Sequence, residues 1–186
     1  MSSRRAFLGL PLGLLAGCGF QPVYGPGRTG SEVPTAAAVG QNEPQLRRAL
    51  ATVRVGQINE RTGQIMRRTL QRNLEGLEPG TPGRYNLEVG LSFAAEPQGF
   101  RRDGIATRVR FVGTATWLLY TLAVPAVLLN RGTARSLDSF NLPDLQFFAA
   151  DASLEDSQRR LIVELSDRVV LGVAIALRQR MAAGTA

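Results

Sequence analysis

The sequence predicts an α+β fold, a two-layer sandwich in which two helices lie on one face of a four-stranded mixed sheet. Two observations carry this prediction. Residues 84–94 alternate apolar with polar or small side chains, the period-two pattern of a strand buried on one face. Residues 147–181 are rich in Ala, Leu, Val, Arg and Glu, and their apolar side chains recur at helical spacing. The 186-residue chain shows no internal repeat, so one domain is expected.

Two shorter elements precede the alternating strand. Val53 and Val55 flank Arg54, which predicts a first strand over residues 50–58. Residues 64–76 carry apolar side chains along one stripe and arginines opposite, which predicts an amphipathic helix that ends at Gly76. The strand of residues 84–94 follows.

The middle of the chain predicts two further strands. A turn is expected over residues 96–104, and a third strand over 105–122 that bends or bulges at Gly113. A fourth strand is expected over 126–140, with a bulge or twist at 130–132. Strands two to four then form an antiparallel meander, and the element order is β-α-β-β-β-α.

Residues 117–129 are apolar almost throughout, except for Tyr120 and Thr121. The length of this segment and Pro125 exclude a membrane span. A hairpin buried on one face needs apolar side chains only at alternate positions, so this segment has an excess. One interpretation is a strand pair covered in part on both faces. The other is a surface that meets lipid tails or a partner protein.

The last helix is expected to lie diagonally across the sheet and to bury its apolar stripe in the core. Ser153 and Asp156 form a start that resembles a capping box, and arginines near the end complement the helix dipole. About 27 residues would give roughly 40 Å of helix.

The N-terminus has the organisation of an export signal. Arg4 and Arg5 precede an apolar run, which ends in Leu15-Ala16-Gly17-Cys18. This order resembles the lipobox of bacterial lipoproteins, in which the cysteine is acylated; Cys18 is the only cysteine of the chain. We therefore expect a lipoprotein signal peptide over 1–17, a lipidated N-terminus and flexible linker over 18–46, one α+β domain over 47–181, and a tail over 182–186. Gly19 favours delivery to the outer membrane, because an acidic residue there would favour retention.

All 22 basic residues are arginine, and the chain has 15 acidic residues and no histidine. Removal of Arg4 and Arg5 with the signal leaves 20 basic residues and a net charge of +5. A basic surface suits nucleic acid, anionic lipid or an acidic partner, and the export signal argues against nucleic acid. Without histidine there is no Ser-His pair and no histidine metal ligand. We expect neither an enzyme nor a cofactor or metal, although paired carboxylates stay possible in principle.

Short segments in order along the mature chain resemble the lipopolysaccharide-assembly lipoprotein (LptE) family. They are GCGFQPVYG at 17–25, VRV at 53–55, RTGQIMR at 61–67, ATR at 106–108, SFN at 139–141 and FAADA at 148–152. The resemblance implies an outer-membrane lipoprotein on the periplasmic face that acts as a plug in the LptD barrel. Such proteins assist folding of that barrel and delivery of lipopolysaccharide to the outer leaflet. The apolar hairpin with Pro125 departs from the Gly/Asn turn expected of the family.

The predicted sheet provides a candidate binding surface for lipopolysaccharide. Its helix-free face carries Arg108 and Arg110 toward one end, and Leu118, Tyr120 and Leu122 toward the other. An amphiphile with phosphates and acyl tails could lie along this gradient, which makes Arg108 and Arg110 the candidate lipopolysaccharide ligands. Two alternatives stay open: an auxiliary lipoprotein of another envelope lipid-transport system, and a lipoprotein hydrolase.

Overall fold

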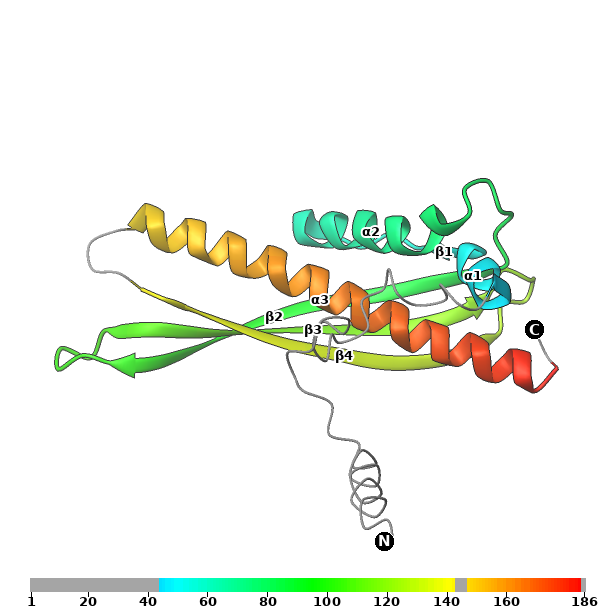
Figure 1. Cartoon of the computed structure of the whole chain (residues 1–186). Coiled ribbons are helices and arrows are strands. Elements are labelled where there is room, and N and C mark those ends of the chain that lie inside the picture. Colours follow the sequence, from blue (N-terminus) through cyan, green and yellow to red (C-terminus); the bar gives the residue numbers. More distant parts are fainter. Residues whose placement is uncertain (1–43, 143–146, 185–186) are drawn as a thin grey trace, which may run out of the picture. The chain divides into compact units, whose positions relative to one another are not determined.

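The computed structural model describes residues 44–142 and 147–184, all of which belong to one compact unit. The predicted signal peptide, Cys18 and most of the linker lie outside these residues. The elements in chain order are α1 (Pro44–Ala51), β1 (Val53–Val55), α2 (Glu60–Leu74), the 3-10 helix η2 (Glu75–Leu77), β2 (Tyr85–Phe100), β3 (Ala106–Thr121), β4 (Leu128–Asn141) and α3 (Phe147–Ala182). The predicted α+β class with a four-stranded mixed sheet is confirmed (Figure 1).

The sheet has the strand order β1-β2-β3-β4. The long strands β2, β3 and β4 are antiparallel neighbours and form the predicted meander. The short strand β1 pairs in parallel with the start of β2, where Val53 lies opposite Tyr85 and Val55 opposite Leu87. The three helices lie on the same side of the sheet (Figure 1).

A helix that the sequence pattern does not predict begins the described domain. Helix α1 covers Pro44–Ala51, so residues 44–46 are helical rather than linker, and β1 is shorter than the strand expected over 50–58. Proline is favoured at the first position of a helix because its missing N–H has no partner there anyway. Leu46 and Leu50, one helical turn apart, are completely buried in the core. The short apolar repeat is therefore a helical face, not part of a strand.

The turn predicted over residues 96–104 starts too early, because β2 continues to Phe100 and only residues 101–105 connect it to β3. Strand β1 pairs only with Tyr85–Leu87, so the rest of β2 is an open edge. The carbonyl of Leu87 faces β1, where it accepts a hydrogen bond from the Gly56 N–H at 2.9 Å. Pro97 is ten residues further in an unbroken register, so its nitrogen faces the same open edge and no ladder hydrogen bond is lost.

The two predicted bulges have different outcomes. The register of β3 with both neighbours is unbroken at Gly113, so no bulge is present there. A Cβ on Gly113 would lie 2.9 Å from Cδ1 of Leu165, which shows that this glycine makes room for α3. A register shift does occur near the predicted position in β4, where Leu119 lies opposite Asn130 but Tyr120 lies opposite Leu128. Leu129 is the extra residue.

Helix α3 lies across the sheet (Figure 1) and buries the predicted stripe. Its fully buried side chains form much of the core between the sheet and the helices; they include Leu161, Ile162, Leu165, Val169, Val170, Val173, Ala174 and Leu177. The prediction that this stripe is core is therefore confirmed.

The Trp117 side chain of β3 fixes the approach of α3. Its indole lies between two glycines, Gly132 of β4 and Gly172 of α3. A Cβ on Gly132 would lie 2.6 Å from Cζ2 of the indole, and one on Gly172 would lie 2.7 Å from the same atom. Both distances are shorter than real contacts, so the two glycines are required by packing against the ring.

The substitution Gly172→Ala tests this packing. Alanine is favoured over glycine in a helix by about 1 kcal/mol, so helix propensity alone predicts a more stable protein. The contact with Trp117 predicts the opposite, because overpacking costs about 1–3 kcal/mol. We expect a lower free energy of unfolding in urea. Gly76→Ala is the matched control, since a Cβ at this position would have no atom within 4 Å. A stabilised Gly172→Ala variant would contradict the packing role of this glycine.

Candidate functional site

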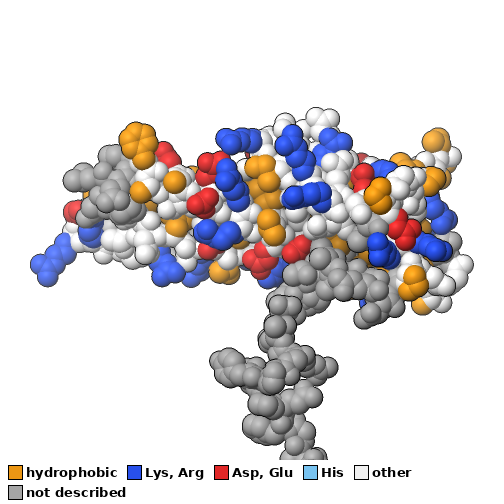
Figure 2. Space-filling view, turned by 45° about the horizontal axis from the view of Figure 1, so that its top comes forward, with side chains coloured by type: hydrophobic (Ala, Val, Ile, Leu, Met, Phe, Trp, Pro, Cys, Tyr) orange, Lys and Arg blue, Asp and Glu red, His pale blue; other side chains and the backbone are white. Residues whose placement is uncertain are grey.

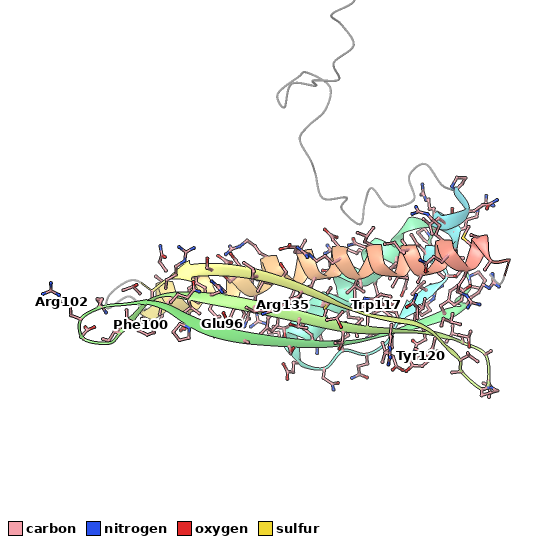
Figure 3. All side chains as sticks on the ribbon, turned by 90° about the horizontal axis from the view of Figure 1, so that it is seen from below. Glu96, Phe100, Arg102, Trp117, Tyr120 and Arg135 are labelled. Carbon is pink, nitrogen blue, oxygen red and sulfur yellow. The ribbon has the colours of Figure 1, made fainter. Side chains whose placement is uncertain are left out.

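The face of the sheet that no described helix covers is the candidate site. Even-numbered residues of β2 and β3 point to this face, and odd-numbered residues point to the helices, as the burial of residues 85–93 and 114–120 shows. Val112 is the one even-numbered residue of these strands that is buried. Figure 3 views this face, with Glu96 and Arg135 midway along the strands and Tyr120 toward the β3–β4 connection. Arg108 and Arg110 lie on this face, as predicted, and both are exposed. Arg135 of β4 adds a third arginine that the sequence pattern does not single out.

The arginines have only surface interactions in the described structure. Arg108 donates from Nη2 to Oγ of Ser139 at 2.6 Å, and Arg110 forms an ion pair with Glu96 at 3.4 Å. Exposed ion pairs of this kind contribute about 0–1 kcal/mol, because water screens both charges. The guanidinium groups can therefore exchange these partners for a phosphate at little cost, through planar bidentate hydrogen bonds.

Toward the β3–β4 end of the same face, the outward side chains of β3 are apolar, although Leu118 lies between Glu88 of β2 and Arg131 of β4. Leu118 and Tyr120 are half-buried, and Leu128, opposite Tyr120 on β4, is exposed. Ten residues of strand separate Arg110 from Tyr120, which corresponds to about 33 Å. The predicted gradient from basic to apolar is therefore present along the outward positions of β3, with charged side chains on the neighbouring strands at Glu88 and Arg131. Such a surface suits an amphiphile that carries anionic groups at one end and hydrocarbon at the other.

The segment of residues 117–129 combines both interpretations that the sequence left open. Trp117 and Leu119 are buried beneath the helices, while Leu118 and Tyr120 are half-buried on the opposite face. Residues 122–128 are all exposed. The excess of apolar side chains thus lies in the connection between β3 and β4.

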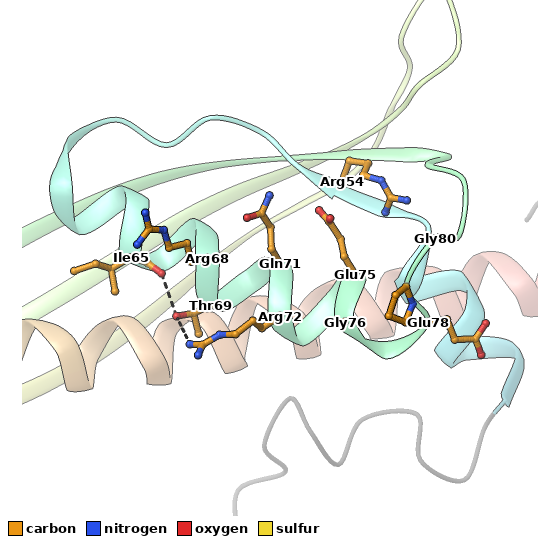
Figure 4. A pocket seen from close by; sticks show the side chains of 11 residues that line it. Arg54, Ile65, Arg68, Thr69, Gln71, Arg72, Glu75, Gly76, Glu78 and Gly80 are labelled. Carbon is orange, nitrogen blue, oxygen red and sulfur yellow. Dashed lines mark hydrogen bonds between the residues drawn. The ribbon is translucent and has the colours of Figure 1, made fainter.

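A cavity on the helix side of the domain is a second candidate (Figure 4). It has a volume of about 730 Å³, and its walls include Arg54, Arg68 and Arg72 together with Glu75 and Glu78. Arg54 donates to the carbonyls of Ala51, at 2.9 Å, and Thr81, so its guanidinium already holds the backbone. The mixed charge of these walls favours neither an anion nor a cation. Figure 2 shows the same mixture of arginine and acidic side chains over the helix layer.

Two carboxylates between α3 and β4 are the strongest acid–base candidates among the described residues. Burial raises the pKa of Asp138, but hydrogen bonds from Arg160, Ser139 and Ser157 outweigh it and lower the pKa below 3.8. A hydrogen bond from Ser136 lowers the pKa of Glu164 below 4.5.

Both carboxylates are therefore ionised at neutral pH, whereas a general acid must carry a proton there. Their hydrogen bonds give them a structural role. Arg160 of α3 donates to Oδ2 of Asp138 through Nη2 at 2.7 Å and Nε at 2.9 Å, and Ser157 donates to the same oxygen at 2.9 Å. Ser136 of β4 donates to Glu164 of α3.

Within residues 44–142 and 147–184, no group of three or more His, Cys, Asp or Glu side chains could hold a metal ion. In the same ranges, no helix has the length and apolar character needed to cross a membrane. Cys18, the predicted lipid attachment site, lies outside the described residues and stays a prediction.

Comparisons with known proteins identify the fold. No protein-family model and no curated protein matches the sequence. A solved structure of a candidate lipoprotein from Caulobacter crescentus CB15 is 23% identical with a TM-score of 0.57, and covers 73% of this chain and 97% of its own. At this identity, the likeness shows a shared fold.

Two further structures share the fold at lower identity. Rare lipoprotein B from Shewanella oneidensis is 8% identical with a TM-score of 0.52, and covers 70% of this chain and 97% of its own. A minor lipoprotein from Acinetobacter baumannii is 14% identical with a TM-score of 0.50, and covers 67% of this chain and 92% of its own.

The lowered pKa values predict that the domain loses stability in acid. A carboxylate whose pKa is lower in the folded state stabilises the fold fully above its unfolded pKa, and this contribution disappears as the pH falls through the folded pKa. We expect the free energy of unfolding to fall as the pH drops below about 4.5.

The variant Asp138→Asn should remove part of this pH dependence. We expect it to cost roughly 1–2 kcal/mol at pH 7, and less as the pH falls toward 3. Asp156→Asn is the control, because Asp156 is an exposed carboxylate of α3. Urea unfolding at several pH values measures both. If the free energy of unfolding depends on pH equally in Asp138→Asn and in the unsubstituted protein, the role of the Asp138–Arg160 pair is contradicted.

Proposed function

We propose that this protein is a lipid-anchored lipoprotein of the outer membrane that forms a complex with the LptD barrel and assists insertion of lipopolysaccharide into the outer leaflet. The observation that carries the proposal is the outward face of β3, which changes along the strand from the exposed Arg108 and Arg110 to Leu118 and Tyr120. Lipopolysaccharide has the matching chemistry, since it combines phosphates with acyl chains. The proposal places the phosphates near Arg108 and Arg110 and the acyl chains toward Tyr120.

Two independent features support the lipoprotein part of the proposal. The sequence Leu15-Ala16-Gly17-Cys18 follows an apolar run with a basic start, which is the order of a lipoprotein export signal. The solved structures that share the fold are described as lipoproteins from three bacteria. Acylation at Cys18 would hold the domain at a membrane without a spanning segment, provided that more than one chain is attached.

The barrel partner is supported by the resemblance to the LptE family. The helices lie on one face of the sheet, which leaves the opposite face free for a ligand. The two carboxylates of the helix–sheet interface are both ionised and internally bonded, so the proposal includes no catalytic step.

Depletion of the protein in its own bacterium tests the proposal most broadly. We expect less lipopolysaccharide at the cell surface and less correctly folded barrel, measured by surface staining and by the heat-dependent gel mobility of the barrel. The protein should also co-purify with a large outer-membrane barrel. Co-purification with an inner-membrane transporter complex would instead favour an auxiliary lipoprotein of another envelope lipid-transport system and would contradict the proposal.

Charge reversal of both arginines tests the binding face itself. We expect Arg108→Glu/Arg110→Glu to weaken binding of purified protein to lipopolysaccharide by about tenfold or more, because two phosphate contacts become repulsive. The matched control is Arg61→Glu/Arg159→Glu, which changes the net charge equally on the helix side, where both arginines contact Glu155. Thermal unfolding confirms that both variants are folded. Equal affinity of the two variants would remove these arginines from the binding site.

A further inference from the structure

An apolar segment of seven residues comprises the six-residue connection between β3 and β4 and the first residue of β4, Leu122-Ala123-Val124-Pro125-Ala126-Val127-Leu128. Every one of these residues is exposed, and 98% of the Val124 surface is accessible to solvent. Large apolar side chains gathered on one exposed loop are unusual in a soluble domain and mark a contact surface. We call this segment the apolar loop.

The ends of the apolar loop are fixed to the sheet. The N–H of Leu122 donates to the carbonyl of Arg84 at 2.9 Å, and the N–H of Thr121 donates to the carbonyl of Val127 at 3.0 Å. The hydroxyl of Thr121 accepts from the N–H of Val127 at 2.9 Å. The loop is therefore held at the end of the β3–β4 hairpin with its apolar side chains in solvent.

The surroundings of the apolar loop are basic. Arg84, whose carbonyl binds the loop, is exposed, and Arg131 is exposed on β4 three residues after the loop. The chain contains no acidic residue between positions 118 and 135. Glu88 lies in the same cross-strand row as Arg131 and is the nearest acidic side chain in the sheet register. Apolar tips with basic flanks suit an anionic lipid surface, where hydrocarbon receives the tip and phosphates face the arginines.

The path of the chain brings such a surface within reach. Helix α1 lies at the same end of the sheet as the β3–β4 connection (Figure 1). Pro44, its first residue, is 26 positions after Cys18. A chain of that length spans at most about 90 Å, so an acyl anchor at Cys18 keeps Pro44 within that distance of the leaflet and allows this end of the sheet to reach it. This step rests on the lipid attachment in the proposed function.

We propose that the apolar loop inserts into the lipid leaflet that holds the anchor, as a second membrane contact of the domain. Two contacts restrict the orientation of the sheet, whereas one flexible tether does not. The β3–β4 end then faces the leaflet, and the β2–β3 hairpin, which carries Phe100 and Arg102 (Figure 3), is directed away from it.

Fluorescence from a label at Val124 tests the insertion. Acylated Cys18 leaves an introduced cysteine as the only thiol, so Val124→Cys can carry an environment-sensitive dye on the mature lipidated protein. The control is Ser92→Cys, an exposed position midway along β2 on the open face. Both proteins are reconstituted in vesicles of phosphatidylglycerol and phosphatidylcholine that contain nitroxide-labelled lipid and neither barrel nor lipopolysaccharide.

We expect a blue-shifted emission at Val124→Cys and about threefold stronger quenching by the nitroxide lipid than at Ser92→Cys. Replacing phosphatidylglycerol with neutral lipid should reduce the difference. Equal quenching at the two positions would overturn the proposal. A blue shift of the dye at Val124→Cys without lipid, at high protein concentration, would also overturn it, because it would indicate that a second copy of the protein covers the loop. Shielding only after addition of a barrel would also overturn it. These vesicles contain no assembly partner, so the result is independent of the lipopolysaccharide and barrel experiments.

Discussion

The packing of the Trp117 indole between Gly132 and Gly172 is the constraint on which the rest of the domain depends. Only glycine at both positions lets α3 approach the sheet closely enough to bury its long apolar stripe. Toward the N-terminal part of α3, where the interface is more polar, the Asp138–Arg160 and Ser136–Glu164 contacts hold the helix on β4. Apolar packing and charge-assisted hydrogen bonds thus hold α3 on one face of the sheet.

The same arrangement defines the opposite face. All described helices lie on one side of the sheet, so the even-numbered positions of β2 and β3 have no helix to contact (Figure 1). Because side chains alternate along a strand, Arg108 and Arg110 point to the open face, whereas Phe111 and Trp117 point to the helices. The chemical gradient along the open face follows from which residues occupy alternate positions of β3, and the apolar loop extends its apolar end.

Periodicity is sufficient to predict the long elements and their faces. The alternation in β2 and β3 and the stripe of α3 place the core and the exposed arginines correctly, because each pattern is repeated over many residues. Short elements are not predictable in this way: α1 has only two buried leucines, and its last residues fit the expected first strand equally well. From the sequence alone, Pro97 predicts a turn, because proline interrupts the hydrogen bonding of a paired strand. In the structure β1 is short and leaves the edge of β2 open at Pro97, and this could not be predicted from the local sequence. The role of Gly172 depends on a contact 55 residues away, for which the sequence has no local signal.

The proposed function places lipopolysaccharide on the open face of the sheet and not on the helix layer. Site-specific photocrosslinking in living cells tests it most directly, with the crosslinking residue at Leu118 on the open face or at Val163, an exposed position of α3. The account predicts lipopolysaccharide adducts from position 118 and few or none from position 163. Adducts from position 163 alone, or equal adducts from both positions, would contradict it.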